Sequence, residues 1–254
     1  MAGARRKLGL IAVAVVAVVA LAGFAGWWFL IRDDAPPEAD IATAGETLDE
    51  AGGEASGDAG GDGNDDGGDG GIEGQWAVDT SLGSFDDFTG TYAGYLLEEE
   101  LAGLGANTAV GRTPDVSGTM TVAGEQVTAA DIEVDLLTLE SDNGTRDGAL
   151  RSRGLESDRF PTATFSLTEP LALPAGVLDG EQASVDATGE LTVHGVTREV
   201  TVALEVELSG TAAAVVGQAP VVLGDFDIDP PTGFSVLSID EQGVFEFQIF
   251  FTRS

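Results

Sequence analysis

His194 is the only histidine among the 254 residues, and the chain contains no cysteine. Metal binding and acid–base catalysis both need several converging side chains, so one histidine is a weak signal for either. His194 stands next to Gly195, between two segments of alternating apolar residues. We interpret it as a turn residue that hydrogen-bonds the backbone, and we predict no metal site and no cofactor.

The hydroxyl and carboxyl groups give equally little indication of catalysis. Ser81 and Ser84 have no base near them in the sequence, and no G-x-S-x-G motif surrounds a serine. Paired carboxylates act as acid and base in glycosidases, but the Asp and Glu residues here mostly alternate with apolar residues, as on solvated strand faces. We therefore predict that the protein is not an enzyme, with a hydrolase as the least favoured interpretation.

The region around His194 shows which elements must position these residues. Apolar and polar residues alternate over 185–193 and again over 196–208. This period of two predicts a long β-hairpin with one apolar and one solvated face. A solvated face requires an antiparallel sheet, and long antiparallel strands with one apolar face either stack as a sandwich or close into a barrel.

The remainder of the chain after residue 74 continues this pattern. We predict an all-β antiparallel domain of about eight strands, with one short helix over 145–153 that turns Leu150 inward. Residues 96–104 are compatible either with a strand or with a short helical turn. The other expected strands lie at 75–79, 91–97, 116–122, 126–139, 163–168, 213–227 and 243–252.

The N-terminal region has the features of a membrane anchor. Residues 8–31 carry no charge and are long enough to cross a bilayer as a helix, which takes about 20 apolar residues. The basic residues of 1–7 precede this span and acidic residues follow it, so the positive-inside rule leaves a cytoplasmic tip and exports the rest. We favour an uncleaved transmembrane anchor in the plasma membrane, with an extracytoplasmic domain, over a cleaved signal peptide.

Glycine and aspartate dominate the segment between this span and the first strand. Both residue types disfavour helix and strand, and we see no apolar period in 32–73, so we predict a disordered acidic linker. The folded domain then covers 74–254. The formal net charge of -33 argues against nucleic acid and anionic lipid surfaces as partners.

Four stretches in this order resemble the YceI-like family of exported lipid-binding domains. They are residues 76–79, Arg146-Asp147 with Leu150, residues 160–165 (FPTATF) and residues 189–198 (GELTVHGVTR). The chain departs from the family at Thr80-Ser81, where the family's opening strand usually continues with a histidine–serine pair. The resemblance implies a lipocalin-like barrel around an elongated apolar cavity that binds polyisoprenoid or similar long-chain amphiphiles. It also implies that homodimers can form.

Residues with the apolar parity of these strands are the expected lining of the barrel, and small residues such as Ala163, Ala183, Ala187 and Gly189 leave room among them. Arg198 shares that parity, so it either reaches out at the rim or contacts a ligand headgroup. Arg146 is expected to pair with a strand carboxylate. The expected ligand-binding residues are Phe165, Leu167, Leu191, Val193, Val200, Val202, Leu204, Phe245, Phe247 and Ile249.

The sequence thus predicts a membrane-tethered, extracytoplasmic protein that holds a long-chain lipid for transport, storage or sequestration. The alternative is a structural or interaction module of the cell envelope whose barrel is packed solid. On the strand at 243–252 we expect Phe247 to face inward and Phe250, with the opposite parity, to contribute little to stability.

Overall fold

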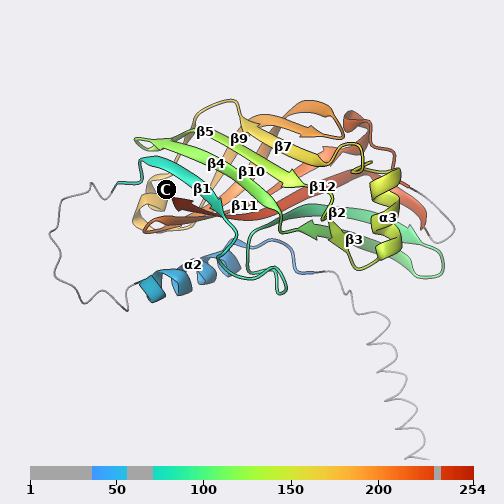
Figure 1. Cartoon of the computed structure of the whole chain (residues 1–254), viewed down its shortest axis with the longest axis horizontal. Coiled ribbons are helices and arrows are strands. Elements are labelled where there is room, and N and C mark those ends of the chain that lie inside the picture. Colours follow the sequence, from blue (N-terminus) through green and yellow to red (C-terminus); the bar gives the residue numbers. More distant parts are fainter. Residues whose placement is uncertain (1–35, 56–70, 232–235) are drawn as a thin grey trace, which may run out of the picture. The chain divides into compact units, whose positions relative to one another are not determined.

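The computed structural model describes residues 36–55, 71–231 and 236–254 (Figure 1). The predicted tip and transmembrane span at 1–31 lie outside these residues. Within the described ranges, no helix is both long and apolar enough to cross a membrane.

The described chain is dominated by twelve strands of one antiparallel sheet. Two α-helices and two short 3-10 helices accompany them. In chain order the elements are α2 (Ile41–Ala55), β1 (Gly74–Asp79), β2 (Tyr92–Leu101), β3 (Gly105–Thr113), β4 (Val116–Ala123), β5 (Gln126–Asp135), β6 (Glu140–Ser141), α3 (Gly144–Ser152), β7 (Thr162–Leu167), β8 (Leu171–Ala172), η1 (Ala175–Asp179), β9 (Ala183–Val193), β10 (Val196–Ser209), β11 (Ala212–Val222), η2 (Leu223–Phe226) and β12 (Val236–Arg253).

Eight of the strands close into a ring. Its order is β1-β4-β5-β7-β9-β10-β11-β12, and pairing of β12 with β1 completes it, with Trp76 opposite Arg253. The 18-residue β12 makes this closure possible, because one of its edges pairs with β11 while the other pairs first with β2 and then with β1. The predicted all-β antiparallel barrel of about eight strands is therefore confirmed.

The strands β2, β3 and β6 form a branch that leaves the ring at β12. Residues 96–101 continue β2 as a strand instead of forming a helical turn, because they pair with β3 on one side and β12 on the other. We did not predict β3 (Gly105–Thr113) as a strand. Its glycines and small polar residues give only a weak apolar alternation.

The helix α2 corrects the prediction that all of 32–73 is disordered. Its 15 residues place Ile41, Ala44 and Leu48 on one side, and these are buried against β10 and β11 on the outside of the barrel. The spacing of three and four residues is that of one helical face, and burial of that face stabilises a helix that its glycines alone would disfavour. The chain therefore has two α-helices where we predicted one.

The burial of Phe250 follows from the same packing. Its ring is completely buried in a cluster with Leu48 of α2 and Val216 of β11. We expected this outward parity of β12 to be solvated, and that expectation is wrong because α2 covers it. Phe247, on the inward parity, is only partly buried.

An ion pair lies buried beside α2. Arg112 Nε of β3 donates to Glu246 Oε1 of β12 over 2.7 Å, and both side chains are almost inaccessible to solvent. The residues just before α2 complete the site, because Arg112 Nη2 donates to the carbonyl of Pro37 and the Ala39 amide donates to Glu246 Oε2. The guanidinium also stacks over Phe88 and Tyr92, so residues 36–40 are bonded into the folded domain.

Candidate functional site

The barrel encloses an inner cavity of about 230 Å³. All ten residues predicted as apolar lining lie on its wall. They reach it because inward-facing side chains alternate along β7, β9, β10 and β12, which are consecutive or nearly so in the ring. Whether they contact a ligand stays a prediction. Among the further wall residues are Trp76, Ala93, Tyr95, Val122, Val127, Ile132, Val134, Leu139, Leu155, Val206, Ala219 and Phe251.

The wall of the inner cavity is almost entirely hydrophobic. Among the described residues that line it, only Glu207 and Glu246 carry a formal charge. Glu246 is engaged by Arg112, and Glu207 accepts a hydrogen bond of 2.8 Å from Gln182. The cavity is therefore suited to an apolar chain and offers little to a polar one.

Small residues keep the cavity open at only some of the predicted positions. Ala163 and Ala187 line it, whereas Ala183 does not. At Gly189 the ring of Phe165 occupies the space, since a Cβ atom there would stand 2.4 Å from Phe165 Cζ. Glycine is thus required at 189 for close approach of an aromatic ring, and it does not contribute free volume.

A second, outer cavity of about 560 Å³ lies beneath α3. It shares Tyr95, Leu155 and Phe245 with the wall of the inner cavity, so these three side chains stand where the two cavities adjoin. Its wall is mixed, with leucines and prolines on one part and charged or polar residues on another. The polar part comprises Glu99, Asn143, Thr145, Arg146 and Arg153.

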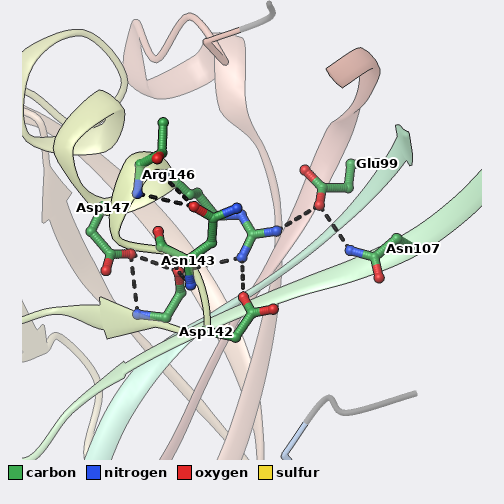
Figure 2. Close-up of polar contacts among 8 residues, drawn as sticks. Glu99, Asn107, Asp142, Asn143, Arg146 and Asp147 are labelled. Carbon is green, nitrogen blue, oxygen red and sulfur yellow. Dashed lines mark hydrogen bonds and ion pairs between the residues drawn. The ribbon is translucent and has the colours of Figure 1, made fainter. Parts of the chain in front are cut away.

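The helix α3 is held at this cavity by its N-terminal cap. Asn143 Oδ1 accepts hydrogen bonds from the amides of Thr145 and Arg146, which satisfies the first free amides of the helix. Asp147 lies in the first turn, where a negative charge complements the helix dipole, and its carboxylate accepts from Ser141 (Figure 2).

Arg146 connects α3 to β2. Its Nη2 donates to Glu99 Oε1 over 2.7 Å, and its Nη1 donates to Asp142 (Figure 2). Asn107 of β3 also donates to Glu99 Oε1, over 2.8 Å. Burial opposes the charged form of Arg146, but the hydrogen bonds and charges of Asp142 and Glu99 outweigh it and raise the pKa. The predicted pairing of Arg146 with a strand carboxylate is confirmed.

Tyr95 was missed by sequence reasoning because its alternation with Ala93 and Leu97 predicts only a core residue. Its ring lies across Gly111 of β3, where a Cβ atom would stand 2.4 Å from the ring. The hydroxyl is buried and has no hydrogen-bond partner within the described residues. Burial raises the pKa of this phenol well above its ordinary value, so the group remains protonated.

His194 and Arg198 occupy structural positions at the β9–β10 hairpin. His194 has a φ of 54° and Gly195 a φ of 75°, which suits a tight two-residue turn. The ring of His194 lies 3.1 Å from the carbonyl of Phe226 and 3.2 Å from Glu156 Oε2, so the predicted turn role with a backbone hydrogen bond is confirmed. Arg198 is exposed and donates to the carbonyl of Thr197. It does not line the inner cavity, so the geometry gives no support to a headgroup contact there.

Fold and site together define a closed antiparallel β-barrel with an apolar interior cavity. Within that class, the chain belongs to the YceI-like family, whose domain model matches residues 76–251. The resemblance noted in the sequence is thereby confirmed over most of the folded domain.

Relatives in sequence and structure agree with this membership. A UPF0312 protein of Vibrio vulnificus is 31% identical over 134 residues, which cover 49% of this chain and 67% of the relative. A UPF0312 protein of Pseudomonas aeruginosa is 32% identical over 146 residues, covering 54% and 72% respectively. In structure, a polyisoprenoid binding domain from Saccharophagus degradans, implicated in plant cell wall breakdown, superposes with a TM-score of 0.52. It is 18% identical, and the match covers 70% of this chain and 98% of that domain.

Proposed function

We propose that this protein binds a polyisoprenoid or similar long-chain lipid inside its barrel, without catalysis, for transport, storage or sequestration. The observation that carries the proposal is the apolar inner cavity enclosed by the strands. Burial of apolar surface contributes roughly 25 cal/mol per Å², so a hydrocarbon chain can be held there without an ion pair. The fold shared with a polyisoprenoid binding domain supports the same conclusion.

We further propose that the protein is tethered to the plasma membrane by residues 8–31 and faces the extracytoplasmic side. The uncharged run and the preceding basic residues support this topology. In intact cells, a Ser56→Cys variant should react with a membrane-impermeant thiol reagent, and the chain contains no other cysteine to confuse the result. Reaction only after the cells are lysed would overturn the topology.

Native mass spectrometry of the detergent-extracted full chain tests the lipid-binding proposal. We expect a co-purifying long-chain lipid, or uptake of added geranylgeraniol. Leu204→Trp places an indole in the inner cavity, whereas Ala203→Trp places it on the exposed face of the same strand and serves as the matched control.

Uptake that is lost in Leu204→Trp and kept in Ala203→Trp, with both variants folded, supports a ligand in the inner cavity. No bound lipid and no uptake by the unmodified chain would favour the alternative, a structural or interaction module. A Leu204→Trp variant that fails to fold would show that the interior tolerates no added volume, and Leu191→Trp then provides a second position on the wall.

A further inference from the structure

The inner cavity is small for a long-chain ligand. Its volume of about 230 Å³ lies below the roughly 300–1,000 Å³ that is typical of ligand pockets. The outer cavity beneath α3 adds about 560 Å³ and adjoins the inner one at Tyr95, Leu155 and Phe245. A chain that fills the inner cavity therefore has a continuation available under α3.

The two cavities differ in polarity in the way that an amphiphile requires. The inner wall is almost free of charge, whereas the outer wall includes Asn143, Thr145, Arg146 and Arg153 along one side. Hydrogen-bonding groups of a ligand are therefore accommodated only in the outer cavity, and the apolar tail belongs in the barrel.

The charges of the outer cavity disfavour an anionic head. Arg146, which a phosphate would seek, already donates to Glu99 and Asp142. The carboxylate of Asp147 stands in the next position of α3, so three carboxylates surround one largely buried guanidinium. Arg153 is exposed to solvent, where its charge is screened. A phosphorylated head would lie among an excess of negative charge in a partly dehydrated site.

We propose that the outer cavity receives the head of the bound amphiphile and selects an uncharged, hydrogen-bonding head over a phosphorylated one. This inference rests on the proposed lipid-binding function, and it assigns Asp142 and Glu99 a role in specificity. The head lies under α3, and the tail passes between Tyr95 and Phe245 into the barrel.

A pair of probes with the same tail tests the selection. Geranylgeraniol and geranylgeranyl pyrophosphate are titrated against the full chain in detergent, with occupancy measured by native mass spectrometry. We expect the pyrophosphate to bind at least about tenfold more weakly, which corresponds to roughly 1.4 kcal/mol of binding free energy. Asp142→Asn removes one exposed carboxylate and should narrow this ratio, whereas Asp86→Asn, on a distant exposed loop, should leave it unchanged.

The position of the head is tested on α3. Ala149→Trp fills the outer cavity, and Gly148→Trp places the same side chain on the exposed face of the helix, where an added Cβ atom would meet no other atom within 4 Å. We expect geranylgeraniol binding to fall at least about tenfold in the first variant only.

Each outcome has a separate meaning. If neither probe binds the unmodified chain, the lipid-binding function itself fails. If the pyrophosphate binds as tightly as the alcohol or more tightly, the inferred selectivity is overturned while lipid binding stands. If a folded Ala149→Trp variant binds both probes normally, the head lies elsewhere. If that variant does not fold, the Asp142→Asn ratio still decides, because Asp142 is largely exposed.

Discussion

Phe250 of β12 and Leu48 of α2 belong to one buried cluster on the outside of the barrel. Phe250 is completely buried there, whereas Phe247, three residues earlier, faces the inner cavity and is only partly buried. We predict that Phe250→Ala lowers the free energy of unfolding by about 3–5 kcal/mol, and that Phe247→Ala costs less because its ring already lacks neighbours on the cavity side. Thermal and denaturant unfolding of the two variants would measure the difference, and a larger loss at Phe247 would contradict it.

The helix α2 should contribute measurably to stability. Leu48 is 1% exposed, so Leu48→Ala removes a buried side chain and should cost about 2–5 kcal/mol. Glu50→Ala, on the exposed side of the same helix, is the control and should change the free energy of unfolding by less than about 0.5 kcal/mol. Equal effects of the two substitutions in denaturant unfolding would show that α2 does not pack on the barrel.

The buried pair of Arg112 and Glu246 predicts an asymmetric response to mutation. Glu246→Gln leaves the guanidinium without its counter-ion and should cost about 3–5 kcal/mol, because an uncompensated buried charge is strongly destabilising. The double variant Arg112→Met with Glu246→Met removes both charges and should recover much of that loss. Arg159→Gln breaks an exposed pair with Glu156 and serves as the control, with an expected effect below about 1 kcal/mol. A double variant less stable than Glu246→Gln would contradict this account.

The two tyrosines of the chain predict a loss of stability at alkaline pH. Burial raises the pKa of Tyr92 from 10 to about 12, although the charge of Arg112 opposes the shift. Because the folded pKa exceeds the unfolded one, the neutral phenol stabilises the fold below pH 10, and this contribution is lost as the pH rises from about 10 to 12.

A shift of this size corresponds to about 2–3 kcal/mol, and Tyr95 acts in the same direction. Denaturant unfolding at stepped pH, with the ultraviolet absorbance of tyrosinate as a direct readout, would measure it. The Tyr92→Phe variant should show a smaller alkaline loss than the unmodified chain. Ionisation of both tyrosines near pH 10 in the folded protein would refute the prediction.

The sequence predicted the barrel and its lining well because both follow from local alternation. At residues 185–208 the apolar period of two identifies which side chains face inward, and all ten predicted lining residues lie on the cavity wall. The same rule applied to β12 correctly turned Phe247 inward. It gave the wrong environment for Phe250, because parity indicates the face of a strand and does not indicate what covers that face.

The features that escaped prediction depend on contacts between distant parts of the chain. The helical face of Ile41, Ala44 and Leu48 is short and lies in a glycine-rich acidic stretch, so its burial is decided by the barrel surface. Arg112 and Glu246 lie 134 residues apart, and nothing in either local sequence indicates the partner. The outer cavity likewise requires that α3, β2 and β12 be brought together first.

The closure of β12 on β1 has a consequence for how the protein is made. Trp76 and Arg253 are paired across almost the whole folded domain, so the ring stays open until the residues of β12 have left the ribosome. Pairing between positions so distant in sequence is also slow, because a long loop must close before any contact rewards it. The newly synthesised strands therefore expose their apolar faces for an extended period, and chaperones or early ligand binding during biogenesis would have their largest effect in this interval.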